Sequence, residues 1–276
     1  MKDERLATSP LKTRRRRWGR VLLILALAGG VWWYWSNWKP PLVIPDGGGV
    51  SEWPSYGGDS GGMRYAPLAQ ITPENVMHLE VAWEYHTGEV GTKRGDSQQA
   101  TTFEARSLVN GTLYLPTPLN RVIALDPETG TEKWSYDPEV DLTGNYSNQL
   151  TSRGVTYWSD PDSGSGRIFV GTNDARLIAL DAASGTPVEE FGDAGQVNLN
   201  LGVGEQKWLG EYQVTSAPVV TQSLVVVGSA VGDNARIDAP SGVVRAYDAK
   251  TGSLRWAWDL APPNFDYENG LISDAG

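Results

Sequence analysis

A short pattern that occurs three times constrains the fold of this chain more than any other feature. The copies are VIALDPETGTEKW at 122–134, LIALDAASGTPVEEF at 177–191 and VRAYDAKTGSLRW at 244–256. In each copy an apolar-alternating strand ends at an Asp, a Gly follows four residues later, and a second strand reaches an aromatic residue. Asp accepts hydrogen bonds from turn amides and Gly tolerates a positive φ, so each copy predicts a β-hairpin. We expect the aromatic residue to staple the outer strand to its neighbour.

The spacing of the hairpins predicts how the sheets are arranged. Asp126 and Asp181 are 55 residues apart, and Asp181 and Asp248 are 67 residues apart. Each interval has room for a four-stranded sheet, and a repeated hairpin cannot bury both of its faces alone. Such sheets stack radially as propeller blades, so the pattern predicts an all-β, partial β-propeller. We expect a partial blade over 53–90 that includes a strand at 79–85, and full blades over about 101–138, 154–192 and 212–259.

Charge is divided unevenly along the 276 residues. Residues 1–20 contain eight basic and two acidic residues, a net charge of +6, whereas the whole chain has a net charge of −10. The remaining residues therefore carry −16, and no cluster of Lys or Arg follows residue 20. Such an acidic domain is a poor partner for nucleic acid, because local basic residues would have to neutralise the phosphates. The chain has no Cys, which excludes disulfides, thiolate metal sites and cysteine nucleophiles.

An apolar segment follows the basic tail of residues 1–20. Residues 21–38 contain no charged residue and end in a cluster of Trp and Tyr. Eighteen helical residues are about 27 Å long, close to the hydrocarbon thickness of a bilayer. The arginine run before the segment and the aromatic belt at its far end place the N-terminus in the cytoplasm. We expect a single-pass anchor in the inner membrane with the rest of the chain in the periplasm; a cleaved export signal is the alternative.

The segments after the anchor predict a linker and an unfinished ring. Residues 39–52 are rich in Pro and Gly, which is typical of an extended linker ahead of a domain at 53–276. Three blades and a fraction cannot close a ring, because closed propellers have about four to eight blades. After Trp258 no further strand pattern follows. We therefore expect this chain to be the N-terminal part of a larger propeller.

Several longer motifs carry a resemblance to a known family. They are WPSYGGD at 53–59, FEA at 103–105, NRVIALDPETG at 120–130, SRGVTYW at 152–158, GTNDARLIALD at 171–181, YQVTSAP at 212–218 and GSAVGDN at 228–234. In these motifs the chain resembles the quinoprotein glucose and alcohol dehydrogenases, which use pyrroloquinoline quinone (PQQ). The resemblance implies an eight-bladed propeller, of which this chain holds about three blades. It also implies bound PQQ and Ca²⁺, a sugar, polyol or alcohol substrate, and membrane quinone as the electron acceptor.

The resemblance also assigns roles to single residues. Positions that contact the quinone in the family are occupied here by Glu104, Gln149, Arg153, Thr215 and Ala230. Asp233 falls at a carboxylate ligand of Ca²⁺, which prefers oxygen ligands. Arg153 suits pairing with the quinone and its carboxylates, because a guanidinium is a planar bidentate donor. From the residues alone, a turn residue beside Asn234 is the better interpretation of Asp233, whereas Thr215 can equally be a β-branched strand residue. Glu104 can also be a solvated strand residue, and Arg153 a surface residue in a turn.

The sequence departs from the family at several of these positions. Residues 146–149 replace a vicinal disulfide of the alcohol-oxidising members, and Gln149 stands where the glucose-oxidising members often have His. Ala230 replaces a Ser that hydrogen-bonds the quinone in the family. The catalytic Asp of the family and its Asn ligand to calcium lie in later blades, so we assign no catalytic residue to this chain and expect it to be inactive alone. A non-catalytic scaffold of the cell envelope and the sensor domain of a receptor remain alternatives.

Overall fold

The structure is a computed structural model that describes residues 27–34, 36, 52–58, 62–89, 101–104, 107–232 and 234–259. It divides into two units, Met1–Gly48 with Ala69–Leu79 and Gly49–Leu68 with Glu80–Gly276. In the first unit, residues 27–34 are helical and Val76–His78 form the short 3-10 helix η1. All the described strands belong to the second unit.

The predicted membrane anchor over 21–38 lies only partly within the described residues. Its middle, residues 27–34, is helical, and residues 21–26, 35, 37 and 38 lie outside the described part of the chain. No helix in the described part has both the length and the apolar character needed to cross a bilayer. The anchor therefore stays a prediction.

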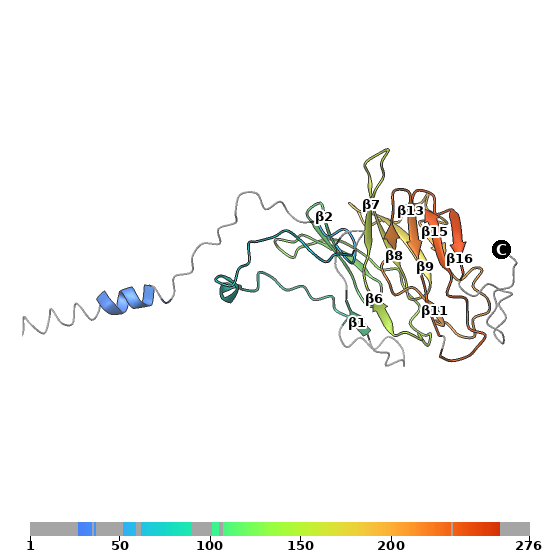
Figure 1. Cartoon of the computed structure of the whole chain (residues 1–276), viewed down its shortest axis with the longest axis horizontal. Coiled ribbons are helices and arrows are strands. Elements are labelled where there is room, and N and C mark those ends of the chain that lie inside the picture. The colour runs from blue at the N-terminus through green and yellow to red at the C-terminus, as the bar shows by residue number, and fades with distance from the viewer. Residues whose placement is uncertain are drawn as a thin grey trace, which may run out of the picture. The chain divides into compact units, whose positions relative to one another are not determined.

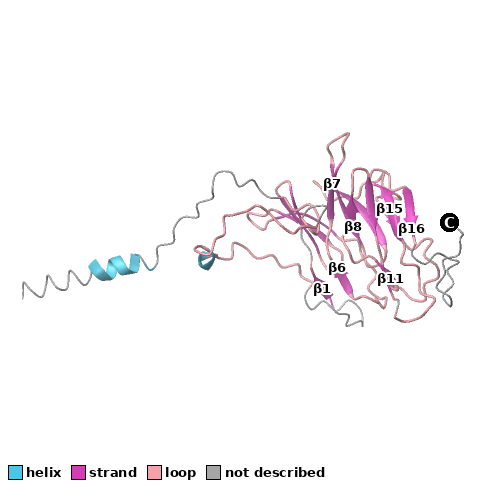
Figure 2. Ribbon diagram, viewed as in Figure 1, coloured by secondary structure: helices cyan, strands magenta, loops and turns pink. Residues whose placement is uncertain are grey.

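Three four-stranded antiparallel sheets follow one another along the chain (Figures 1 and 2). In each sheet the strands are hydrogen-bonded in sequence order. Sheet 1 contains β2 (Ser107–Val109), β3 (Thr112–Pro116), β4 (Val122–Leu125) and β5 (Glu132–Tyr136). Sheet 2 contains β7 (Thr156–Ser159), β8 (Gly166–Gly171), β9 (Arg176–Asp181) and β10 (Gln196–Asn198). Sheet 3 contains β12 (Val219–Val220), β13 (Leu224–Val227), β15 (Val244–Asp248) and β16 (Leu254–Trp258).

Two short ribbons complete the described strands. β1 (Thr101–Phe103) pairs in parallel with β6 (Leu150–Ser152), and β11 (Tyr212–Gln213) pairs antiparallel with β14 (Ala230–Val231). β1, β6 and β11 lie together at the lower end of the sheets in Figure 1. Because β6 leads into sheet 2 and β11 leads into sheet 3, the ribbons bring residues from successive sheets together.

The predicted hairpins are confirmed at β4–β5 and β15–β16, and each of the three Asp residues closes its turn. In the second copy the return strand predicted up to Phe191 is wrong, because residues 186–191 contain only an isolated bridge at Pro187 and β9 pairs instead with β10. Oδ1 of Asp126, for example, accepts hydrogen bonds from the amides of Glu128 and Thr129 at 3.0 and 2.9 Å. The glycine amide of each turn donates to the carbonyl of the same Asp, at 2.8 to 2.9 Å. Gly130, Gly185 and Gly252 have φ values of 70°, 74° and 69°, the left-handed region in which glycine avoids strain.

Trp134, the aromatic residue of the first copy, contacts the next sheet, which differs from the predicted contact with a neighbouring strand. Trp134 of sheet 1 packs on the turn of sheet 2, where its Nε1 donates to Ala182 O at 3.1 Å. A carbon atom added to Gly185 in that turn would lie 2.4 Å from the Trp134 ring. Trp83 packs in the same way over Gly130 of sheet 1. Gly130 and Gly185 therefore also leave room for an indole, whereas a carbon atom added to Gly252 would meet the backbone of Gly192.

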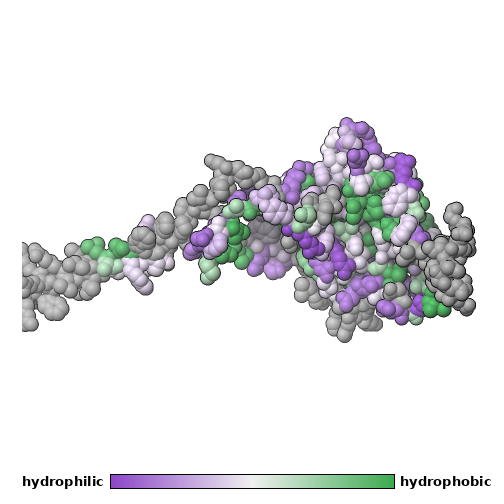
Figure 3. Space-filling view, in the orientation of Figure 1, coloured by the Kyte–Doolittle hydropathy of each residue, from purple (hydrophilic) through white to green (hydrophobic). Residues whose placement is uncertain are grey.

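Sheet 2 is buried on both faces because its side chains alternate between two cores. Ile168 and Val170 of β8 pack with Tyr114 and Ala124 of sheet 1. Phe169, which lies between them in sequence, packs with Val225 and other residues of sheet 3. On the face drawn in Figure 3, polar residues gather over the loops at the strand ends and apolar residues appear between them.

The prediction of an all-β domain is confirmed, and the described strands form no closed ring. The predicted strand at 79–85 is wrong, because residues 79–89 contain no strand. A strand needs a partner with which to pair its backbone groups, and no other described strand pairs with this segment. Trp83 nevertheless contacts a repeat turn as Trp134 does.

Candidate functional site

The parallel pairing of β1 with β6 brings Glu104 and Arg153 together. Thr101 lies opposite Leu150 and Phe103 opposite Ser152, so Glu104 and Arg153 each follow the last residue of a paired strand. Glu104 Oε2 lies 3.0 Å from Arg153 Nε. The two side chains are 34% and 41% exposed, so solvent or a ligand can reach the ion pair.

Arg153 also binds Thr215, which follows β11. The backbone amide of Arg153 donates to Thr215 O at 2.9 Å, and its Nη1 donates to Thr215 Oγ1 at 2.8 Å. Thr215 is 7% exposed, so this hydrogen bond anchors one edge of the guanidinium against the protein. Glu104, Arg153 and Thr215, which are far apart in sequence, therefore form one connected group.

Gln149 and Ala230 lie on the same two ribbons. Gln149 directly precedes β6, is exposed, and has a φ of 64°. Its Oε1 lies 3.5 Å from Thr102 Oγ1 of β1, the limit for a hydrogen bond. Ala230 begins β14 and lies opposite Gln213 of β11. The structure thus places Gln149 next to the β1–β6 ribbon and Ala230 on the β11–β14 ribbon.

Asp233 lies outside the described residues, but both of its flanks are described. Gly232 N donates to Glu211 O at 2.8 Å. Arg236 Nε lies 2.6 Å from Oε1 of Glu211, whose side chain is fully buried. This hydrogen bond from Arg236 lowers the pKa of the Glu211 carboxyl group. Glu211 therefore holds both ends of a short loop that starts from β14.

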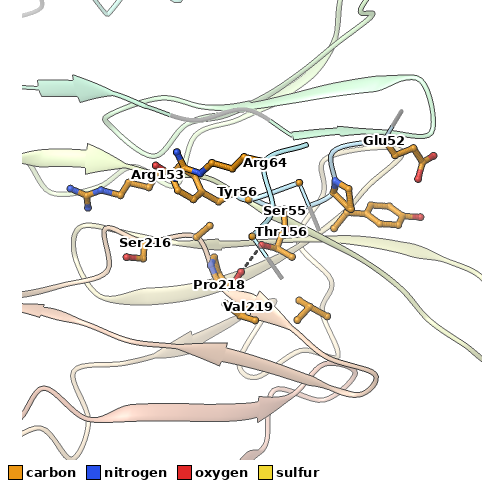
Figure 4. A pocket seen from close by; sticks show the side chains of 16 residues that line it. Glu52, Ser55, Tyr56, Arg64, Arg153, Thr156, Ser216, Pro218 and Val219 are labelled. Atoms are coloured by element: carbon orange, nitrogen blue, oxygen red, sulfur yellow. Dashed lines mark hydrogen bonds between the residues drawn. The ribbon is translucent and has the colours of Figure 1, made fainter. Parts of the chain in front are cut away.

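A cavity of about 710 Å³ lies beside Arg153. Its walls come from residues 52, 54–58, 62 and 64, from β7 and from residues 216–220. Figure 4 shows Arg153 and Ser216 at one end of this cavity and Glu52 at the other. Thr156 Oγ1 donates to Pro218 O at 2.5 Å across the cavity wall, which joins the first strands of sheets 2 and 3.

The donors at this site suit an anionic ligand. A half-exposed guanidinium held in place by a hydroxyl can bind a carboxylate in a planar, bidentate manner. Among the described residues there is no group of three or more His, Cys, Asp or Glu side chains placed to hold a metal ion.

Sequence reasoning missed two side chains near this site. Ser229, which precedes Ala230, has a buried hydroxyl with no hydrogen-bond partner in the described part of the chain. It lies one position before the place where a Ser was expected, and that proximity is the signal that could have identified it. Glu211 directly precedes the YQVTSAP motif and gave no such signal, because its partner Arg236 is 25 residues away.

Comparison with known proteins gives consistent matches. A family model for the PQQ glucose/ethanol/alcohol dehydrogenase β-propeller domain matches residues 53–273. Quinoprotein glucose dehydrogenase A of Acinetobacter calcoaceticus is 37% identical over 232 residues, which cover 78% of this chain and 29% of that protein. The glycerol dehydrogenase large subunit of Gluconobacter oxydans is 39% identical over 218 residues, which cover 77% and 29%.

A solved structure matches the fold as well. The quinohemoprotein alcohol dehydrogenase of Comamonas testosteroni superposes with a TM-score of 0.59 and 29% sequence identity. The match covers 78% of this chain and 28% of that one. The chain spans less than a third of the length of each of these proteins.

Proposed function

The chain belongs to the PQQ glucose/ethanol/alcohol dehydrogenase family of β-propellers, and on this premise we propose that it is the N-terminal part of a PQQ- and Ca²⁺-dependent dehydrogenase. Its substrate is a sugar, polyol or alcohol. The three sheets are about three blades of an eight-bladed ring within residues 53–276. The observation that carries this proposal is the group formed by Glu104, Arg153 and Thr215 between successive sheets.

The residues of this group suit the quinone. PQQ is planar and carries carboxylates, and bound PQQ supplies the electron acceptor that protein side chains lack. Arg153 would pair with its carboxylates, and Thr215 holds the guanidinium in place. Glu104, Gln149 and Ala230 line the same ribbons. Ser229, whose buried hydroxyl has no hydrogen-bond partner in the described part of the chain, is the hydroxyl-bearing residue nearest in sequence to Ala230.

Asp233 is the proposed ligand of Ca²⁺ in this chain. It follows β14, whose partner strand β11 leads directly to Thr215. Carboxylate oxygens are preferred calcium ligands, and several are needed to fill the coordination sphere. The remaining ligands and the catalytic base would come from later blades. The chain of 276 residues alone should therefore not oxidise a substrate.

The location of the protein is part of the same proposal. Residues 1–20 form a basic cytoplasmic tail, residues 21–38 a single-pass anchor in the inner membrane, and residues 39–52 a linker to a periplasmic domain. The uncharged segment bounded by arginines and aromatic residues supports this arrangement. An anchored enzyme would pass its electrons to membrane quinone. Recovery of the full-length protein in the soluble fraction would contradict the anchor.

Titration of PQQ into the full-length apoprotein with excess Ca²⁺ tests the proposal. We expect quenching of tryptophan fluorescence on binding, and dye reduction with at least one substrate among glucose, glycerol and ethanol. Arg153→Ala should weaken PQQ binding by at least about tenfold, because a charge-assisted hydrogen bond is lost. Arg255→Ala is the matched control, since Arg255 of β16 is an exposed arginine paired with Asp248 of β15. Absence of PQQ binding by the wild-type protein would overturn the proposal.

A further inference from the structure

Three buried carboxamide side chains form a continuous hydrogen-bonded row across the three repeats. Asn120 lies in the β3–β4 connection, Asn173 in the β8–β9 connection and Gln213 in β11, and each is 0% exposed. Nδ2 of Asn173 donates to Asn120 Oδ1 at 2.8 Å. Nε2 of Gln213 donates to Asn173 Oδ1 at 3.2 Å. Buried amides that satisfy one another in this way specify one arrangement of the surrounding chain.

The row ends on the backbone of residues 148–151. Oε1 of Gln213 accepts a hydrogen bond from Asn148 N at 2.8 Å, and its Nε2 also donates to Gln149 O at 3.0 Å. Asn173 Oδ1 accepts a longer hydrogen bond from Thr151 N at 3.4 Å. The Gln213 side chain is therefore hydrogen-bonded to the backbone amide of Asn148 and to the backbone carbonyl of Gln149.

The hydrogen bonds from Gln213 act at a strained backbone position, Gln149, which lies just before the candidate site in sequence. Gln149 has a φ of 64°, a conformation that residues with a side chain rarely adopt unless their surroundings impose it. The next residues form β6, and β6 ends immediately before Arg153. A shift at Gln149 would be carried through β6 to the Arg153 guanidinium and its contacts with Glu104 and Thr215.

We propose that Gln213 is a positioning residue that holds Gln149 in its left-handed conformation and aligns Arg153 for the quinone. This role rests on the proposed function, because it assumes that PQQ binds beside Arg153. Gln213 acts through the backbone of residues 148–149, and its own side chain is fully occupied by that backbone and by Asn173.

Gln213→Met in the full-length protein tests this role, since Met keeps the length of the side chain and removes its polar atoms. We expect amide hydrogen exchange at residues 148–151 of the apoprotein to accelerate by about tenfold or more, and PQQ to bind about tenfold more weakly at saturating Ca²⁺, as the loss of one to two hydrogen bonds predicts. Tyr114→Phe is the matched control. It removes one buried hydrogen bond, from Tyr114 Oη to Ala182 O, far from residue 149 in the chain.

The control should lower the melting temperature without changing PQQ affinity or exchange at residues 148–151. Unchanged PQQ affinity in Gln213→Met would overturn the positioning role, as would unchanged exchange at these residues. If the wild-type protein bound no PQQ, the proposed function would fail together with this role, while the exchange measurement would still decide whether Gln213 holds the segment. Should Gln213→Met not fold, Gln213→Asn keeps the carboxamide but withdraws it by one methylene, and the same two losses are expected.

Discussion

The absence of a side chain at Gly185 allows Trp134 of sheet 1 to pack against sheet 2. Gly185 has a φ of 74°, and an added carbon would lie 2.4 Å from Trp134. We expect Gly185→Ala to lower the free energy of unfolding by about 2 to 4 kcal/mol, through backbone strain and overpacking together. Gly111→Ala is the control, because Gly111 has a φ of 64° but nothing within 4 Å of the added carbon. Urea denaturation should give a loss of only about 1 kcal/mol there. Equal losses would contradict the contact with Trp134.

Asp248 links the stability of a turn to pH. Burial raises its pKa, but hydrogen bonds from Arg255 and from the turn residues 250 and 251 outweigh burial and lower the pKa to about 2. The folded state therefore holds the proton less tightly than the unfolded state, where the pKa is near 3.8. The stabilisation is present above about pH 4 and is lost as the pH falls toward 2.

Asp248→Asn measures this contribution. Asn can still accept hydrogen bonds from the turn amides through its Oδ1, but it does not ionise. We expect the variant to unfold at lower denaturant concentration than the wild type at pH 6, by about 1 kcal/mol, and to match it more closely near pH 2. A difference that stayed constant between pH 6 and pH 2 would contradict the assignment.

At the residue scale, local spacing was enough to predict the turns but not the amide row. Asp126 and Gly130 act on neighbours within a few residues, so their pattern is visible in the sequence. Gln213 forms hydrogen bonds with residues that are 64 and 65 positions earlier in the chain. Its own motif gives no sign of this, because there Gln213 resembles an ordinary strand residue. Glu104, Arg153 and Thr215 were found by family resemblance, and the structure brings them together. Their role with PQQ stays a prediction.

At the scale of elements, equivalent strands of the repeat differ in what covers them. β5 presents Trp134 to the turn of sheet 2, whereas Trp256 of β16 is 42% exposed. In the 276-residue chain we expect Trp134→Ala to lower the free energy of unfolding by about 3 kcal/mol, because packing and a hydrogen bond are lost. Trp256→Ala should cost less than about 1 kcal/mol in the same denaturation experiment. A similar loss at both positions would show that the indoles contribute through their own sheets only.

The segment over 79–85 explains why strand prediction fails at particular elements. Its alternation of apolar and polar residues is typical of a strand. Alternation is a property of a single segment, however, and a stable strand also needs a second strand with which to pair. Trp83 contacts the β4–β5 turn, although the segment that contains Trp83 forms no ladder of backbone hydrogen bonds. The position of an aromatic residue in the repeat was thus predictable, while its partner in the next sheet was not.

For the whole molecule, the order in which the three sheets pack predicts which strands are best protected from hydrogen exchange. Sheet 2 contributes to the two larger hydrophobic cores, whereas every residue of β16 is exposed. We expect amides of β8 and β9 to exchange with solvent slowest and those of β16 fastest. Phe169→Ala should reduce protection in sheets 2 and 3 together, because Phe169 is fully buried in their shared core. Uniform exchange across the three sheets would contradict this order.

The exposed indole of Trp256 has a spectroscopic consequence. Iodide should quench the emission of Trp256 far more strongly than that of Trp158, whose ring is buried in the core of sheets 2 and 3. The difference spectrum between wild type and Trp256→Phe therefore isolates a probe on the outer strand of sheet 3. If a further repeat covers that strand in the full-length protein, its emission maximum will move to shorter wavelength and iodide will no longer reach it.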